Sequence, residues 1–220
     1  MPLWPNNDAQ SCLPPKRGAA MVSYPPEPWE LNGRACVSVW LVRATALPPL
    51  PVRPVTVLGR AVVGTAFVHY QPPGLAYHEL VAAVLVRQGL RFGVSITRIW
   101  VDSPASRAGG RELWGIPKEL AEFEWERGLT ASARDVNGTI ASVRGRQLRI
   151  GVWLPVATST WQAFGSGLAR TPLRAKGFVT ALRTSWDIDP AGPLSWLLPH
   201  RPLLSVGIRG MSMRFGPRRR

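Results

Sequence analysis

Hydrophobic and polar residues alternate along many short stretches of this 220-residue chain. The clearest stretch is 121–126, with the sequence AEFEWE, in which every second residue is apolar. A period of two is typical of a strand with one buried and one exposed face. Valine-rich and aromatic stretches, separated by turns that contain proline or glycine, predict further strands at 35–42, 55–63, 65–70, 80–86 and 92–100.

The second half of the chain continues this pattern. Stretches 130–133 and 139–143 flank Asn137 and Gly138, a dipeptide that favours the tight turn of a β-hairpin. Further strands are predicted at 148–154, 178–186 and 204–215, whereas 161–177 shows no clear period and leaves room for a short helix. Many short strands with little helical periodicity indicate a mainly β fold, either a sandwich or a barrel.

Composition agrees with one globular unit. Apolar residues make up 45% of the chain and charged residues 18%, which fits a protein with a substantial core. The length suits a single domain. Residues 1–20 have no periodicity and are expected to form a mobile tail, so the domain is assigned to 21–220, with Met1 and Met21 both possible starts.

The sequence gives no indication of a membrane, secreted or metal-binding protein. No apolar run approaches the roughly 20 residues of a membrane-spanning helix, and no secretory leader is evident. Two cysteines and three histidines lie in separate segments without the spacing of metal ligands. We therefore expect a cytoplasmic protein with no membrane partner and no metal.

The net charge of +14 raises the question of nucleic acid. The basic residues are scattered, however, and they form no stripe interleaved with aromatic residues. Nucleic acid is therefore not expected as the main partner. The same charge fits a codon bias, or a field that draws an anionic substrate toward a cleft.

Lys118 is unusual because only three of the 27 basic residues are lysines. Arginine stays protonated, whereas a lysine buried in apolar surroundings can become neutral and nucleophilic. Ile116 and Pro117 precede Lys118, and Trp114 lies nearby in the sequence. A lysine in this state can attack a ketone and form a Schiff base. The alternative is a solvated lysine in a turn after proline.

Residues 110–118, GRELWGIPK, resemble the nucleophile motif of the acetoacetate decarboxylase family, with Lys118 at the Schiff-base position. Two further segments agree in order along the chain. Residues 29–34, WELNGR, resemble the segment with the family's active-site arginine, here Arg34, and 75–79, LAYHE, the segment with its glutamate, here Glu79. The resemblance implies a single-domain closed, cone-shaped β-barrel with flanking strands and few short helices, and with the lysine inside.

The resemblance also implies a lyase that acts on a keto acid. The simplest reaction is decarboxylation of a 3-keto acid through an iminium and an enamine on Lys118. Arg34 would bind the substrate carboxylate in a bidentate manner, and Glu79 would handle protons. Tyr77 and Trp114 are candidates for binding substrate, with surface exposure and ordinary packing as their alternatives. No cofactor is implied, and the expected partners are the keto acid and further copies of the chain in a homo-oligomer.

Two other functions fit the same residues. An aldolase-dehydratase or a cyclase could use the same Schiff base on a 2-keto acid, and a barrel could also bind ligands without catalysis. The chain has Glu119 where the family's decarboxylases have a second lysine. In an extended segment Glu119 would point away from Lys118. Glu119 is odd-numbered, like the apolar residues Ala121, Phe123 and Trp125. Either the buried face of the strand therefore changes near Leu120, or Glu119 is paired with a partner inside the protein.

Overall fold

The computed structural model describes residues 22–126 and 129–219, apart from the side chains of 148 and 149. The predicted tail, 1–20, lies outside these residues. The described part has one α-helix, α1 (Pro104–Trp114), and two short 3₁₀ helices, η1 (Ala44–Ala46) and η2 (Ser195–Leu197). Its strands are β1 (Trp29–Arg43), β2 (Arg53–Pro54), β3 (Thr56–Val57), β4 (Arg60–Gln71), β5 (Tyr77–Gln88), β6 (Arg91–Val101), β7 (Lys118–Leu120), β8 (Glu122–Trp125), β9 (Leu129–Asp135), β10 (Gly138–Phe164), β11 (Gly167–Ile188) and β12 (Pro202–Phe215).

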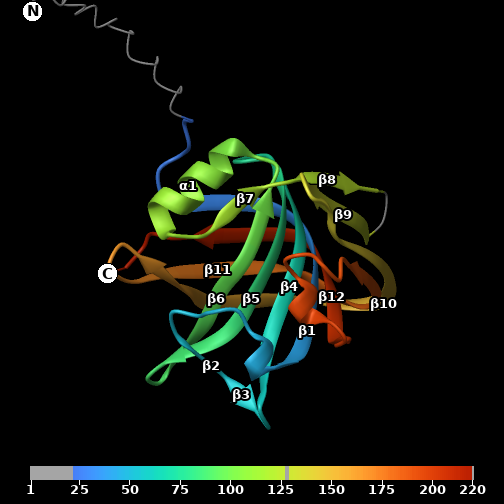
Figure 1. The fold of residues 1–220 in the computed structure, drawn as a ribbon. Coiled ribbons are helices and arrows are strands. Elements are labelled where there is room, and N and C mark those ends of the chain that lie inside the picture. The colour runs from blue at the N-terminus through green and yellow to red at the C-terminus, as the bar shows by residue number, and fades with distance from the viewer. Residues whose placement is uncertain (1–21, 127–128, 220) are drawn as a thin grey trace, which may run out of the picture.

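All these strands belong to one sheet, which closes on itself (Figure 1). The order is β7-β6-β5-β4-β1-β12-β11-β10-β9-β8. The long strand β10 pairs with β9 near its start, and near its end Thr160 pairs with Val94 of β6. This last pairing joins the two sides of the sheet. The expectation of a mainly β fold with a closed barrel is therefore confirmed.

Side chains alternate between the two faces of β4, β5 and β6, and most residues on both faces are buried or half-buried. On β5, the odd-numbered residues Tyr77, Glu79 and Val81 point into the barrel, where they line a cavity. The even-numbered residues, such as Leu80, pack in a second core on the outer face. Strands β9, β10 and β11 contribute to that outer core, so the later part of the chain covers the outside of the earlier strands.

Local turn chemistry explains where the predicted strands were right or wrong. The hairpin around Asn137 and Gly138 is confirmed as the β9–β10 turn. The predicted strand 55–63 is wrong, because a turn at Leu58 and Gly59 divides it into β3 and the start of β4. Stretch 161–177 contains no helix; its residues form the hairpin between β10 and β11.

The sequence prediction missed α1, although its end signals are present. Ser103 caps the helix, since its hydroxyl accepts a hydrogen bond from the Ser106 amide at 3.1 Å, and Pro104 occupies the first turn. Gly115 ends the helix in the left-handed conformation at φ 65°. In the described residues, no helix has the length and apolar character needed to cross a membrane.

Candidate active site

Lys118 is buried at the start of β7, where the chain leaves α1 and rejoins the sheet. β7 pairs in parallel with the end of β6, with Lys118 beside Ile99. The lysine is 4% exposed. Gly110 of α1 lies against its stem, because a Cβ at that position would come within 2.7 Å of Lys118 Cδ. The glycine of the GRE sequence therefore allows the helix to cover the lysine closely.

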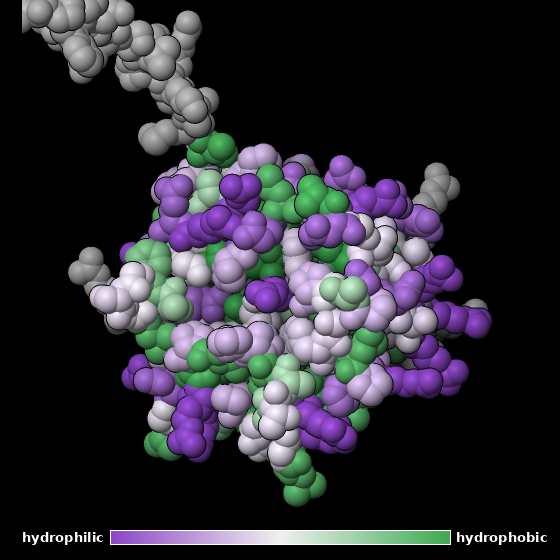
Figure 2. Space-filling model, in the orientation of Figure 1, coloured by the Kyte–Doolittle hydropathy of each residue, from purple (hydrophilic) through white to green (hydrophobic). Residues whose placement is uncertain are grey.

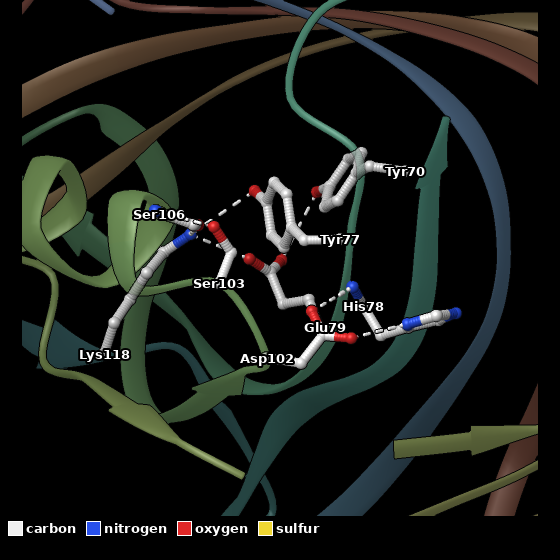
Figure 3. Close-up of polar contacts among 8 residues, drawn as sticks. All are labelled: Tyr70, Tyr77, His78, Glu79, Asp102, Ser103, Ser106 and Lys118. Atoms are coloured by element: carbon white, nitrogen blue, oxygen red, sulfur yellow. Dashed lines mark hydrogen bonds and ion pairs between the residues drawn. The ribbon is translucent and has the colours of Figure 1, made fainter. Parts of the chain in front are cut away.

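The amine of Lys118 contacts three oxygen atoms (Figure 3). Nζ donates to Glu79 Oε2 at 2.9 Å and to Ser106 Oγ at 2.9 Å. A longer contact of 3.4 Å joins Nζ to the Tyr77 hydroxyl. Three elements thus meet at one nitrogen: β7 supplies the lysine, β5 supplies Glu79 and Tyr77, and α1 supplies Ser106.

Tyr70 and Tyr77 enclose the carboxylate. They are directly paired on β4 and β5, with ring centroids 4.6 Å apart. The Tyr70 hydroxyl donates to Glu79 Oε1 at 3.3 Å. Burial, followed by the charge of Glu79, raises the pKa of each tyrosine well above its usual value. Both hydroxyls therefore stay protonated at working pH and can donate hydrogen bonds.

The lysine and the glutamate form a deeply buried pair, with Glu79 7% exposed. Two opposite charges removed from water are costly unless their hydrogen bonds are satisfied. A proton that moves from Nζ to Glu79 leaves two neutral groups and a nucleophilic amine. The geometry therefore offers both a nucleophile and a group that can accept and return its proton.

The lysine lines an apolar cavity of about 290 Å³. Its polar lining residues are Tyr70, Tyr77, Glu79, Lys118 and Thr160, and the rest are apolar. No arginine is among the described residues that line it. An uncharged substrate portion fits this lining, whereas a lasting negative charge would find only Lys118.

Trp114 packs against neighbouring aromatic rings and also lines the cavity. Its ring contacts Trp29 and Phe215 edge-on, at centroid distances of 4.7 and 4.6 Å. Its Nε1 donates to Glu27 Oε2 at 2.6 Å, away from Lys118. Trp114 also lines the cavity. Trp114 therefore has a packing role, and it also forms part of the cavity wall that a substrate could touch.

The structure does not bring Arg34 to Lys118, contrary to the expectation from sequence. Arg34 lies on the even-numbered face of β1, the face on which Cys36 and Trp40 enter the outer core. Its Nη2 is 3.3 Å from His69 Nδ1, and its guanidinium lies 5.1 Å from the centroid of the Trp125 ring. The sheet therefore separates this guanidinium from the cavity, and the proposed contact with a substrate carboxylate has no geometric support.

His78 and Asp102 extend the chain of contacts that begins with Arg34 and His69. His78 Nδ1 is 2.7 Å from Asp102 Oδ2, and the His78 amide donates to Asp102 Oδ1 at 2.8 Å. The His69 and His78 rings lie 4.4 Å apart. Figure 3 shows Glu79 pointing toward Lys118 while the neighbouring His78 points away toward Asp102. We call Arg34, His69, His78 and Asp102 the outer cluster.

Glu119 points away from the amine of Lys118, as alternation predicted. Its carboxylate pairs with Arg111, and its side chain is 59% exposed. Arg111 also donates from Nε to the Lys118 carbonyl oxygen at 2.7 Å. Glu119 is therefore neither paired inside nor in contact with Nζ. The arginine of the GRE sequence instead holds β7 from the outside.

Sequence reasoning missed Ser106 and Tyr70. Ser106 lies one turn after the cap residue Ser103, so a prediction of α1 would have placed it near the lysine motif. Tyr70 was within a predicted strand, but only its pairing with Tyr77 brings it to Glu79. Within residues 22–126 and 129–219, no group of three His, Cys, Asp or Glu side chains is arranged to hold a metal ion.

Comparisons with known proteins show the family and the fold of the chain. The family profile of acetoacetate decarboxylase (ADC) matches residues 11–154. The fold is similar to that of acetoacetate decarboxylase from Legionella pneumophila subsp. pneumophila str. Philadelphia 1, at 20% identity over 99% of this chain and 97% of that chain, with a TM-score of 0.72.

Two further solved structures are similar in fold. The enduracididine biosynthesis enzyme MppR, complexed with pyruvate, is 14% identical over 91% of this chain and 92% of its own, with a TM-score of 0.62. An acetoacetate decarboxylase-like enzyme from Sphingomonas wittichii RW1 is 17% identical over 92% of this chain and 98% of its own, with a TM-score of 0.60.

No curated protein matches the sequence. At these identities the solved structures show similarity of fold alone. The family profile, in contrast, matches more than half of the sequence, including the lysine motif. The chain belongs to the acetoacetate decarboxylase family.

Proposed function

We propose that this protein is a Schiff-base-forming lyase that decarboxylates a 3-keto acid with an apolar substituent. The observation that carries the proposal is the Lys118 amine, which is almost fully buried and lies 2.9 Å from Glu79 in an apolar cavity. Membership of the family and the fold of its decarboxylases support the same reading.

In this reaction Lys118 Nζ adds to the ketone carbon, and loss of water gives an iminium. The electrons of the bond to the carboxylate then move into the iminium, which releases carbon dioxide and leaves an enamine. Glu79 takes up from solvent the one proton that the overall reaction consumes, and donates it to the enamine carbon. Water finally hydrolyses the new iminium, which frees the ketone and restores the amine.

The cavity favours decarboxylation over 2-keto-acid chemistry. Decarboxylation disperses the negative charge of the carboxylate in the transition state, and an apolar lining stabilises the dispersed charge relative to the localised one. A 2-keto acid would keep its carboxylate through every step, yet no described lining residue except Lys118 is cationic. The complex of MppR with pyruvate makes an aldol-type reaction of a 2-keto acid the second candidate.

The volume of the cavity bears on the substrate's size. About 290 Å³ is near the lower limit of pockets that enclose drug-sized ligands. A 3-keto acid that carries an alkyl chain would therefore fill the cavity better than the smallest member of the series. Each added methylene group that leaves water should raise kcat/KM about fourfold, until the cavity is full.

The test is carbon dioxide release from 3-keto acids of increasing alkyl length, run beside pyruvate with an aldehyde. We expect release from the 3-keto acids, with kcat/KM that rises and then falls along the series. Condensation of pyruvate without carbon dioxide release would assign the aldol-type reaction. Binding of keto acids without any turnover would assign a non-catalytic barrel.

A further inference from the structure

The end of the barrel away from α1 presents apolar side chains to solvent. We call the two segments 53–60 and 87–92 the distal end; they include the β3–β4 and β5–β6 turns, both at the lower side of Figure 1. Leu58 is 98% exposed and Leu90 is 95% exposed. Figure 2 shows apolar surface at the tip below β3, beside strongly hydrophilic surface.

Leu58 has a backbone conformation that its side chain disfavours. Leu58 and Gly59 have φ angles of 50° and 72°, which is the pattern of a type I′ hairpin turn. Asparagine and glycine adopt these angles easily, whereas leucine is a steric outlier there. A residue that strains its own turn and buries nothing in the fold is best explained by a contact outside the fold.

Arginines surround these leucines. Arg43 lies directly opposite Arg60 on β1 and β4, and Arg53 lies directly opposite Arg87 on β2 and β5. Arg91 begins β6, and all five are exposed. Like charges directly opposite each other destabilise a sheet.

No described carboxylate offsets this charge. None of the five arginines forms an ion pair within the described residues. Between Glu30 and Asp102 the sequence has Glu79 as its only acidic residue, and Glu79 is buried beside Lys118. Burial, followed by the charges of Arg60 and Arg43, lowers the pKa of the nearby His200. The distal end therefore combines projecting leucines with uncompensated positive charge.

We propose that the distal end docks on an anionic membrane surface, in place of the expectation from sequence that the protein has no membrane partner. Leu58 and Leu90 enter the boundary between headgroups and acyl chains, as the apolar parts of interfacial proteins do. The arginines behind them meet the anionic headgroups, each contributing about fivefold to partitioning. The attachment is reversible and sensitive to salt, because neither turn spans the lipid. It does not depend on the reaction proposed for Lys118.

Two other occupants fit this end less well. Nucleic acid is bound by phosphate contacts together with aromatic stacking, and the distal end exposes one aromatic side chain, Phe92, against the aliphatic Leu58, Leu90 and Val57. A second copy that met this end symmetrically would bring the same arginines against each other. Anionic lipid offers negatively charged headgroups to the arginines and an apolar region to the leucines.

The first test is co-sedimentation of the full chain with vesicles. We expect binding to vesicles of equal parts phosphatidylcholine and phosphatidylserine, and none to phosphatidylcholine alone. Leu58→Asn and Leu90→Ser should each weaken partitioning on the order of tenfold, since each removes one leucine that leaves water. Leu58→Asn should also raise the melting temperature, because asparagine suits the left-handed turn; weaker binding would then not be due to unfolding.

The matched control for the leucines is Val136→Ser. Val136 is 100% exposed in the β9–β10 turn, beside Asp135. This substitution should leave vesicle binding unchanged. For the charges, Arg87→Gln and Arg91→Gln should weaken binding, whereas Arg144→Gln, in a groove with Glu124 and Glu126, should not.

Three results would overturn the proposal. The first is no binding to the phosphatidylserine vesicles. The second is binding that survives both leucine substitutions and is competed by an oligonucleotide, which would indicate a general polyanion surface. The third is loss of self-association in Leu58→Asn and Leu90→Ser without any vesicle binding by the unaltered chain, which would assign these leucines to an interface between copies.

Discussion

Two polar clusters lie back to back on opposite faces of the same strands. The inner cluster consists of Lys118, Glu79, Ser106, Tyr70 and Tyr77, and the outer cluster lies behind it. His78 and Glu79 are neighbours in the sequence, but alternation along β5 sends one to each cluster. Each cluster contains a cation and a carboxylate, so residue types alone do not distinguish them.

Burial and the choice of cation do distinguish them. The Lys118 and Glu79 side chains are 5% and 8% exposed, whereas those of His78 and Asp102 are 25% and 33% exposed. Water weakens interactions in the outer cluster. Arg34 cannot lose its proton, whereas Lys118 can pass one to Glu79. Only the inner cluster can therefore supply an amine nucleophile.

The largest difference is expected between the two carboxylates. Glu79→Gln should lower kcat by about 10²–10⁴-fold, because it removes the group that accepts and returns protons. The matched change in the outer cluster, Asp102→Asn, should have a much smaller effect, through the position of β5 alone. Carbon dioxide release measures both variants. Equal losses in the two variants would show that Glu79 acts through structure and not through proton transfer.

A hydroxyl in the inner cluster should matter less. Ser106→Ala removes a hydrogen bond to the Lys118 amine and should lower kcat/KM about tenfold to a hundredfold. The matched control is Ser103→Ala on the same helix, which removes the N-cap and should lower the free energy of unfolding by about 1 kcal/mol. Turnover should stay nearly constant in this control. If Ser103→Ala reduced turnover as much as Ser106→Ala, Ser106 would have no specific role.

Arg34→Met tests whether Arg34 takes part in binding the substrate carboxylate. Turnover of keto acids should stay close to that of the unaltered chain, because Arg34 lies on the other side of the sheet from the cavity. Loss of its contact with Trp125 should lower the free energy of unfolding by about 0.5–1 kcal/mol. A large rise in KM for keto acids, with adducts of uncharged ketones unaffected, would restore Arg34 as the carboxylate-binding residue.

The smallest expected effect is on the pH dependence of stability. Burial, followed by the charges of His78 and Arg34, lowers the pKa of His69 in the folded protein. The unfolded chain therefore binds more protons at this position, so the free energy of unfolding falls as the pH drops below about 6.5. Urea unfolding above and below that pH should show that the free energy of unfolding falls less at acid pH in His69→Gln than in the unaltered chain. Equal acid losses would contradict this assignment.

Much of the fold follows from alternation, but the site follows only in part. Tyr77 and Glu79 are two residues apart, so a strand there places both on one face. From Cys36 to Val42, β1 is buried on one face and half-buried on the other, and both faces carry apolar residues, so alternation could not show which face of the strand lines the cavity. Closure of the barrel depends on the pairing of Thr160 with Val94. Such distant pairing leaves no local pattern in the sequence.

The central claim is that Lys118 forms a covalent imine with a keto acid. The most direct test is borohydride reduction during turnover, followed by intact and peptide mass spectrometry. We expect one stable adduct per chain, on the peptide that contains Lys118, and none in Lys118→Arg, which keeps a cation beside Glu79 but cannot form the imine. An adduct that persists in Lys118→Arg, with Lys176 the first position to examine, would contradict the account.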